Sequence, residues 1–430
     1  MIDRYTAPTI RPTTRKLIIF LSLLSALVSL QLITPPAIAQ AGSDQIKFVY
    51  PECSQAMKDY FQLKYAIAIG SPVLCSLAIF GFLNSGLIAA AREKLKIKLS
   101  SPLSLAKFIL LFYSLCFALK LPFYFYSGYM LEQQFKLSQQ SIGSWLHGIF
   151  GLYLEGLILV PVLTLCLLLI RRFPKYWHLL IGLLLGCVIA GIAYLQPLVV
   201  DPYFNKFHDL PEGSLKKNIR ILSLQSGLEH PQILVADKSK QTKKMNAYVN
   251  GIASSNRIVL FDNLVNDVPE KQILAVVAHE LGHYRLNHLY TGLALAIAGL
   301  FPLLYIWKTA TDKFLPKLPR RWGIKTNSDP VLLAVWCIVI WIAPLVISPI
   351  PAFVSRLLES EADAYAIRLS HDPLSAAEIL RTLSQKNLSD PDPPAFIEFW
   401  FFSHPSIKHR IDYALEQLRE RRESAQRSEE

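Results

Sequence analysis

The chain has 430 residues, of which 52% are hydrophobic and only 18% are charged. Soluble domains usually carry about a quarter of their residues as charges, so this composition excludes an ordinary soluble enzyme, a disordered regulator and a fibrous protein. The 44 Lys and Arg exceed the 32 Asp and Glu, which gives a net charge of +12. Because the basic residues cluster beside apolar segments, where they set topology and meet anionic headgroups, we expect membrane lipid and no nucleic acid as a partner.

The chain begins with a basic segment up to Lys16, followed by an apolar stretch from Leu17 to about Ile33 and by small residues at 37–41. This order is typical of a cleavable secretory signal. An uncleaved first transmembrane helix explains the same residues, and the sequence leaves both interpretations open.

Six further apolar segments reach or approach the roughly 20 residues that a membrane core requires. They lie at about 65–90, 103–126, 145–170, 176–200, 289–307 and 330–354. Lys120 lies near the end of one segment, where its side chain can reach the headgroups, whereas Glu155 points to a wet cavity. We therefore expect a multi-pass integral membrane protein, in a bacterial-type plasma membrane or an internal membrane.

Two stretches, 201–288 and 355–430, are water-soluble in character. Their patterns predict helices at 215–228, 271–288, 353–370 and 374–388, and strands at 232–236, 247–253 and 258–261. The last residues, from about Leu418 to Glu430, are almost all charged or small and polar, and we expect them to fray.

The expected fold is mainly α, with about six to seven transmembrane helices and a small α+β domain. We divide the chain into a signal-like or first transmembrane segment (1–41), a transmembrane helical domain (42–200), an α+β domain that includes two spans (201–416), and a charged tail (417–430).

The sequence His279-Glu280-Leu281-Gly282-His283 lies within the helix expected at 271–288. Two histidines four residues apart share one helix face and can bind one metal ion through their ring nitrogens. Glu280 lies beside the open position of that metal, where it can take a proton from the activated water. Such a pattern arises by chance in on the order of one in a hundred chains of this length. The alternative is a buried helix whose histidines bond to the backbone or to each other.

A catalytic zinc takes three protein ligands and keeps one position open. His288 is five residues beyond the motif and rotates off its helix face. The helix expected after the last span carries Glu359 and Asp363 on one face, whereas Glu361 points elsewhere. One of the two carboxylates can bind the metal while the other orients a ligand histidine. The alternative is a solvated acidic face.

The motif HELGH, then transmembrane segments, then SRLLESEADAYA from residue 355, resembles the CAAX prenyl protease 1 family of multi-pass membrane zinc endopeptidases. Three other stretches are similar to that family. They are LPFYFY and LEQQF within 121–135, NAY at 246–248 with RIVLFD at 257–262, and SHPS at 403–406 with an arginine at 410. The resemblance covers, in order, nearly the whole chain after the signal-like segment.

The resemblance implies that the α+β domain at 201–416 is a zinc-metalloprotease (metallopeptidase) domain. In it, His279, His283 and Glu359 would bind one zinc ion and Glu280 would be the general base. The resemblance also implies that Asp363 orients a ligand histidine. The family fold is a ring of helices around a wet chamber, which would suit a buried ionisable group within the spans.

By the same resemblance, His404 lies near the oxyanion or the substrate and Arg410 supports it. Asn246 and Tyr248 are expected on an edge strand that receives an extended substrate through main-chain hydrogen bonds. The family often has a Ser- and Arg-rich turn before this strand, whereas here the turn at 238–245 is rich in lysine. This difference leaves the choice of substrate open.

Basic residues fill alternate loops, at 1–16, 92–98, 171–175 and 313–325, and the positive-inside rule places these loops in the cytoplasm. That assignment puts 201–288 on the outer side, whereas eukaryotic members of the family are thought to face the cytosol. The sequence does not decide the side.

The leading hypothesis is a membrane zinc endopeptidase that trims CAAX-type prenylated C-termini, acting on a peptide or protein substrate with or without a lipid. A general membrane-protein quality-control protease without prenyl preference is the first alternative. A transporter or sensor with a structural metal is the second, and it predicts a fourth protein ligand. The oligomeric state is not predicted.

Overall fold

The computed structural model describes residues 48–251 and 256–429. The chain divides into two units, Met1–Val49 and Tyr50–Glu430, and the architecture below is that of the second unit. The signal-like or first transmembrane segment expected within residues 1–41 lies outside the described residues.

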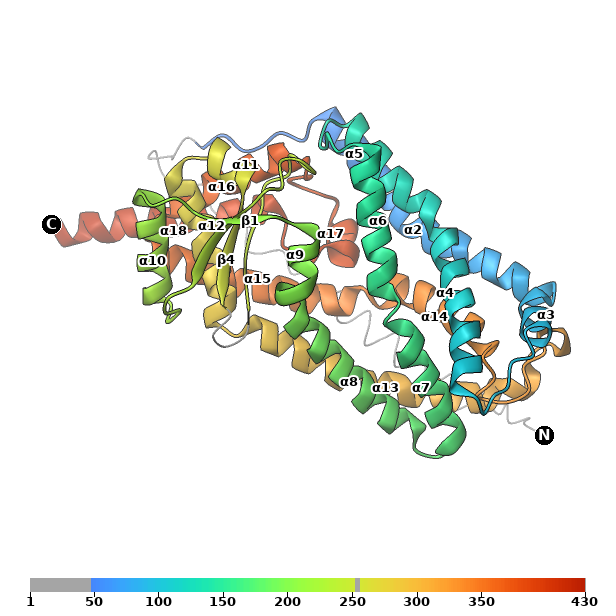
Figure 1. The fold of residues 1–430 in the computed structure, drawn as a ribbon. Coiled ribbons are helices and arrows are strands. Elements are labelled where there is room, and N and C mark those ends of the chain that lie inside the picture. The colour runs from blue at the N-terminus through green and yellow to red at the C-terminus, as the bar shows by residue number, and fades with distance from the viewer. Residues whose placement is uncertain (1–47, 252–255, 430) are drawn as a thin grey trace, which may run out of the picture. The chain divides into compact units, whose positions relative to one another are not determined.

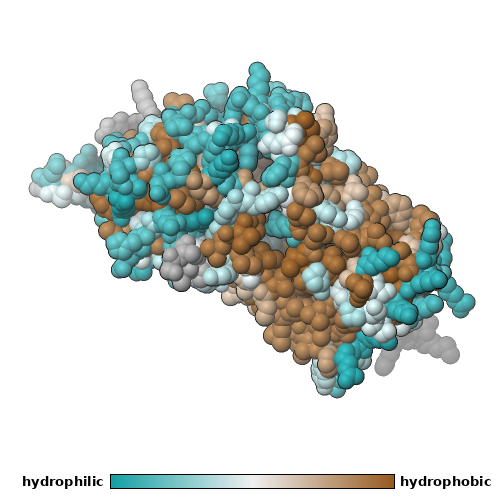
Figure 2. All heavy atoms as spheres, viewed as in Figure 1, coloured by the Kyte–Doolittle hydropathy of each residue, from teal (hydrophilic) through white to brown (hydrophobic). Residues whose placement is uncertain are grey.

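Long helices run through this unit (Figure 1), and several of them are long and apolar enough to span a membrane. The spanning candidates are α2 (Gln55–Asn84), α4 (Pro102–Phe125) with η1 (Tyr126–Met130) and α5 (Leu131–Gln134), α6 (Ile142–Gly156) with α7 (Leu159–Arg172), α8 (Trp177–Leu195) with η2 (Gln196–Val200) and α9 (Asp201–Phe204), and α13 (His288–Phe314) with η4 (Leu315–Lys317). Hydrophobic residues cover these helices between two hydrophilic ends in Figure 2. The expected multi-pass membrane fold is confirmed, with five spans among the described residues, or six if one bent pair crosses as a unit.

The bent pair replaces the straight span expected at 330–354. It consists of α14 (Leu332–Ile347) and α15 (Pro349–Ser370), which differ in direction by 52°. Proline cannot donate the hydrogen bond that would continue a helix, and the break falls directly before Pro349. The expected span at 65–90 also has other bounds, because Gly86 takes a left-handed conformation (φ 75°) between α2 and a short helix, α3 (Leu87–Lys94).

A four-stranded sheet lies in the water-soluble part, in the order β1-β2-β4-β3. The strands are β1 (Phe207–Asp209), β2 (Gln232–Ala236), β3 (Ala247–Asn250) and β4 (Arg257–Phe261). The pair β2 and β4 is parallel, and the other two pairs are antiparallel. β1 was not expected from the sequence, and β3 ends three residues earlier than expected. Its place in the order makes β3 an edge strand.

Helices pack on this sheet and on one another. They are α10 (Ser214–Gln225), α11 (Asp262–Asp267), α12 (Glu270–Arg285), α16 (Pro373–Asn387), α17 (Ala395–Phe401) and α18 (Ile407–Glu429). The core between sheet and helices contains fully buried Ile258, Leu260, Leu264 and Val277. α12 approaches α15 closely at Gly282, where a Cβ atom would lie 3.1 Å from the backbone of Ala362.

The expected fraying of the last residues is wrong for the described part of the tail. α18 continues to Glu429, and Arg421 donates a hydrogen bond of 3.0 Å to the carbonyl of Ile367. An ion pair between Glu423 and Arg427, four residues apart, lies in the last turns. The domain boundaries at 200 and 416 stay a prediction.

Candidate active site

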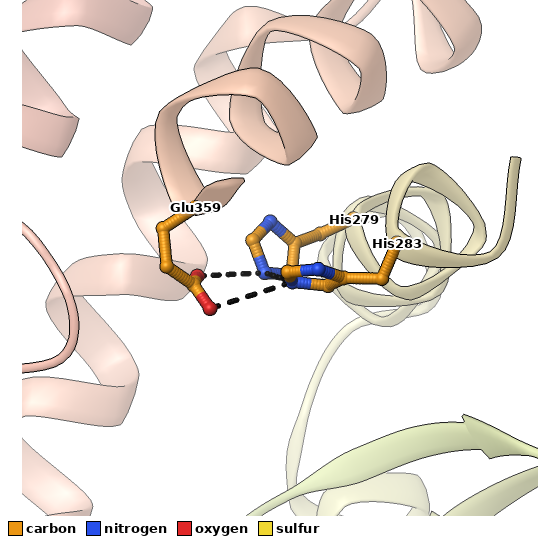
Figure 3. Close-up of side chains that lie close together, drawn as sticks. All are labelled: His279, His283 and Glu359. Atoms are coloured by element: carbon orange, nitrogen blue, oxygen red, sulfur yellow. Dashed lines mark hydrogen bonds and ion pairs between the residues drawn. The ribbon is translucent and has the colours of Figure 1, made fainter. Parts of the chain in front are cut away.

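Three side chains from two helices converge in the water-soluble part (Figure 3). His279 and His283 come from α12, with their Nε2 atoms 3.1 Å apart, and Glu359 comes from α15. Glu359 Oε2 lies 3.2 Å from His279 Nε2, and Glu359 Oε1 lies 3.4 Å from His283 Nε2. Among residues 48–251 and 256–429, these three residues form a group that could hold a metal ion.

The geometry of this group fits a zinc ion. Ligands at about 2.0–2.1 Å from a tetrahedral zinc lie roughly 3.3 Å from one another, and the three observed separations are 3.1, 3.2 and 3.4 Å. Glu359 Oε2 is buried without a hydrogen bond, which is unfavourable unless a cation or a proton compensates its charge. Three ligands would leave one coordination position open.

A charged pair supports His279 from behind. Asp363 Oδ1 lies 2.9 Å from His279 Nδ1, and Arg410 donates two hydrogen bonds of 2.7 Å to the Asp363 carboxylate. Burial alone would lower the pKa of His279, but its contacts with Asp363 and Glu359 outweigh burial and raise the pKa to about 9. Burial likewise opposes the charge on Arg410, and the Asp363 carboxylate outweighs it and raises the pKa of Arg410. The contact at Nδ1 leaves Nε2 of His279 for the metal position.

Glu280 lies on the same helix, between the two histidines. Burial raises the pKa of the Glu280 carboxyl, although the nearby His279 and His283 act in the opposite direction. The backbone of Val249, in edge strand β3, hydrogen-bonds to this carboxyl. A raised pKa suits a group that must accept and then return a proton near neutral pH.

His404 reaches the site from the segment between α17 and α18. Its Nε2 atom lies 3.7 Å from Glu359 Oε1, and its Nδ1 atom lies 3.0 Å from the hydroxyl of Ser403. Burial lowers the pKa of His404, yet its side chain is still 53% exposed. The structure therefore places the His404 imidazole beside the metal group and open to a cavity.

This cavity has a volume of about 690 Å³, and Glu280, His404 and Asn246 are among the residues that line it. Asn246 lies one residue before β3. Tyr248 lies on β3, but its hydroxyl donates a hydrogen bond of 3.2 Å to Asp201. The Tyr248 side chain is thus held against Asp201 rather than open to the cavity.

The structure corrects one expectation from the sequence, the position of His288. His288 does not rotate away, because α12 ends at Arg285 and Asn287 takes a left-handed conformation (φ 58°) that starts α13. His288 Nδ1 then lies 2.9 Å from His283 Nδ1. Glu361 is not part of the metal-binding group, as expected, and its Oε2 atom lies 3.2 Å from His288 Nε2. Asn287 was the available signal, since asparagine tolerates this backbone conformation.

Arg356 is another residue that the sequence did not single out. Its Nη1 atom lies within hydrogen-bond distance of the carbonyl oxygens of Glu398 (3.1 Å), Phe399 (3.4 Å) and Phe402 (2.7 Å). These carbonyls end α17, two to six residues before His404. Arg356 therefore anchors the segment that carries His404 to the helix that carries Glu359.

A second cavity of about 690 Å³ lies among the spanning helices. Glu155 lines it, in agreement with the expected cavity. Lys120 lines the same cavity, and its Nζ atom lies 4.7 Å from the centre of a Trp341 ring. The expectation that Lys120 extends to the headgroups is therefore wrong, since a cation–π contact holds it inside.

Comparison with known families agrees with this arrangement. Residues 209–418 match the family described as peptidase family M48. Residues 43–206 match the family described as CAAX prenyl protease N-terminal, five membrane helices. Together with the spanning helices, these matches define a multi-pass membrane metalloprotease.

Individual relatives show to which group of membrane metalloproteases the chain is similar. The chain is 30% identical to "Uncharacterized metalloprotease YhfN" of Bacillus subtilis, over 67% of this chain and 68% of the relative. It is 30% identical to CAAX prenyl protease 1 of Saccharomyces cerevisiae, over 72% of each chain. The crystal structure of S. mikatae Ste24p superposes with a TM-score of 0.71 at 26% identity, covering 83% of this chain and 87% of that one. The chain belongs to peptidase family M48, in the group of CAAX prenyl protease 1.

Proposed function

We propose that this protein is a zinc-dependent endopeptidase that cleaves near the C-terminus of membrane-attached substrates that carry a prenyl group. The observation that carries the proposal is the convergence of His279, His283 and Glu359 at tetrahedral spacing, with Glu280 beside them. The printed name of the yeast relative, CAAX prenyl protease 1, supports the substrate class.

The two histidines would hold the zinc ion through their Nε2 atoms, and Glu359 would hold it through its carboxylate. When bound, zinc supplies Lewis acidity towards the scissile carbonyl and lowers the pKa of water. Asp363 and Arg410 would keep the His279 ring in the orientation and tautomer that this binding requires.

Glu280 would act as the general base, taking a proton from the attacking water and passing it to the leaving amine. His404 would donate a hydrogen bond from its imidazole to the oxygen on which negative charge develops. A donor aimed at that oxygen stabilises the transition state more than the ground state.

The substrate would lie extended along β3, whose outer edge has no strand partner among the described residues. Main-chain hydrogen bonds to an edge strand give affinity, and pockets for alternate side chains give selectivity. Asn246 and Tyr248 would contribute to this edge, and the cavity beside Glu280 would take side chains on one side of the scissile bond.

A structural metal site in a transporter or sensor would need a fourth protein ligand. The metal-binding group among the described residues has three members. His288, one of the two candidates for a fourth ligand, faces the Nδ1 atom of His283 rather than the Nε2 side. His404 is more than half exposed and lines the cavity. These placements favour the catalytic site.

A cleavage assay tests the proposal. The detergent-purified protein is given a farnesylated CAAX peptide and, separately, the same peptide without the prenyl group. Glu280→Gln and a chelator-treated sample should be inactive, and zinc should restore activity to the treated sample. Glu416→Gln, an exposed carboxylate on α18, is the matched control and should cleave at the wild-type rate.

Cleavage of the prenylated peptide alone would support the full proposal. Equal cleavage of both peptides would replace the prenyl preference with a broad membrane protease. Activity that survives Glu280→Gln, or that does not respond to removal of metal, would exclude the mechanism.

A further inference from the structure

The second histidine of the metal group has its own support, formed by another histidine and a carboxylate. His283 Nδ1 and His288 Nδ1 are 2.9 Å apart, with their rings at 72° to each other. The other nitrogen of His288, Nε2, lies 3.2 Å from Glu361 Oε2. His288 is only 6% exposed, so these contacts replace the hydrogen bonds that water would otherwise make.

The chemistry of the rings allows one arrangement of protons along this chain. A histidine that binds a metal through Nε2 carries its proton on Nδ1. His283 Nδ1 therefore donates to His288 Nδ1, which must be an unprotonated acceptor. The proton of neutral His288 then lies on Nε2, where it donates to the Glu361 carboxylate. Every nitrogen of both rings has a partner in this arrangement.

We propose that His288 is a positioning residue for the metal ligand His283, and that Glu361 acts through His288 by fixing its tautomer. The inference rests on the proposed function, because it assumes that His283 binds zinc through Nε2. An acceptor at Nδ1 orients the ring and makes the metal-binding nitrogen more basic. The chain from His283 to Glu361 therefore raises the affinity of the site for zinc.

The two ligand histidines are thus supported in different ways. His279 contacts the Asp363 carboxylate directly, whereas His283 reaches a carboxylate through a neutral imidazole. His288 is also the first residue of α13, a spanning helix. The position of a membrane helix and the orientation of a metal ligand are therefore linked through one hydrogen bond.

The test is the zinc dissociation constant of the full-length protein in detergent, measured by competition with a chelator and without any peptide. His288→Phe keeps a planar ring but removes the acceptor, and it should weaken zinc binding by about 10- to 100-fold. His288→Asn places an amide oxygen near the position of Nδ1 and should bind within about threefold of wild type. His208→Phe, an exposed position on β1, is the matched control and should bind like wild type.

Glu361→Leu leaves no acceptor for His288 Nε2 and separates the proposed relay from a local effect of charge. It should weaken zinc binding in the wild-type background and have no effect in the His288→Asn background, because that asparagine cannot pass on the contact. This pair of measurements also stands if His288→Phe fails to fold.

Wild-type affinity in His288→Phe would overturn the inference and leave the proposed function intact. An equal effect of Glu361→Leu in both backgrounds would overturn the role of Glu361 in fixing the tautomer. Failure of the wild-type protein to bind zinc would overturn the proposed function together with this inference.

Discussion

Arg410 and Asp363 join the last helix of the chain to α15, the helix that carries Glu359, through two parallel hydrogen bonds of 2.7 Å. Both side chains are largely buried, at 13% and 15% exposure. The carboxylate of this pair also contacts His279 Nδ1. The C-terminal helix is thereby part of the support of the proposed metal site, although it lies more than 100 residues after the HELGH motif.

Arg410→Met should weaken both zinc binding and folding. The substitution leaves the Asp363 charge buried without its main partner, which costs about 3–5 kcal/mol of folding free energy for a fully buried pair. It also removes support behind the metal ligand His279, and such a loss lowers zinc affinity about 10- to 100-fold. Chelator competition and thermal unfolding measure the two effects. Arg422→Met, exposed on the same helix, should change neither. Unchanged zinc affinity in Arg410→Met would contradict the assigned role.

Arg356→Met should lower kcat with little change in KM. The substitution removes the donor that holds the carbonyls at the end of α17, so His404 is no longer fixed relative to Glu359. A displacement of about 1 Å can cost on the order of 100-fold in rate. Steady-state kinetics check this expectation, with zinc content measured alongside and expected to stay at the wild-type level. Arg368→Met, exposed on the same helix, is the control and should leave kcat and KM unchanged. If Arg356→Met raises KM without lowering kcat, Arg356 belongs to substrate binding instead.

Glu132→Gln should destabilise the junction between the membrane helices and the start of β3. Glu132 lies between two lysines, at 2.8 Å from Lys64 and 2.9 Å from Lys244, and accepts a hydrogen bond of 2.7 Å from Tyr60. Burial lowers the pKa of Lys244, and Glu132 opposes that effect. Because both lysines are about one-third exposed, we expect a loss of roughly 1–3 kcal/mol, less than for a fully buried pair.

Thermal unfolding in detergent measures this loss. Glu423→Gln, in an exposed ion pair with Arg427, is the control and should change stability by less than about 0.5 kcal/mol. Equal melting temperatures for the two variants would show that the buried cluster contributes no more than a surface pair.

The contact between His409 and Glu398 should make stability depend on pH. Glu398 raises the pKa of His409 above its ordinary 6.5, while burial partly opposes the rise. A histidine whose pKa is raised by folding contributes its full stability below pH 6.5, and loses it as pH rises through the folded-state pKa. The contribution is below about 1 kcal/mol, because the His409 side chain is 60% exposed.

Melting temperatures of wild type and His409→Gln between pH 6 and 9 test this dependence. The difference between the two proteins should be largest at pH 6 and should shrink as pH rises. Since the same Glu398 carboxylate accepts a hydrogen bond of 3.0 Å from the backbone of Ser406, loss of the contact loosens the segment that follows His404. A difference that does not vary with pH would rule out titration of His409 as its source.

The sequence predicted those features that depend on the pattern of residues close together in the chain. The spacing of His279 and His283 places them on one helix face, and uninterrupted apolar segments of about 20 residues indicated the spans. Glu359 was named as the ligand only through resemblance to a family, because spacing alone left Glu359 and Asp363 as alternatives. The assigned roles of these residues stay proposals.

Features that depend on where a helix ends could not be predicted. His288 belongs to the site because α12 stops at Arg285, and a continued helix would have pointed it elsewhere. The break before Pro349 divides a segment whose hydropathy is continuous. β1 has three residues and pairs with β2 at the edge of the sheet, so it is too short for its sequence to show a strand pattern.

His288 begins one spanning helix, and Glu359 lies on the continuation of a bent pair that qualifies as another. The proposed reaction therefore takes place beside the membrane, where a lipid anchor confines a substrate to two dimensions at high effective concentration. For such a substrate, the quantity that sets the rate is the number of molecules per area of bilayer. Dilution with inert lipid at constant bulk concentration should slow the cleavage of an anchored substrate, whereas a soluble peptide should be cleaved at the same rate.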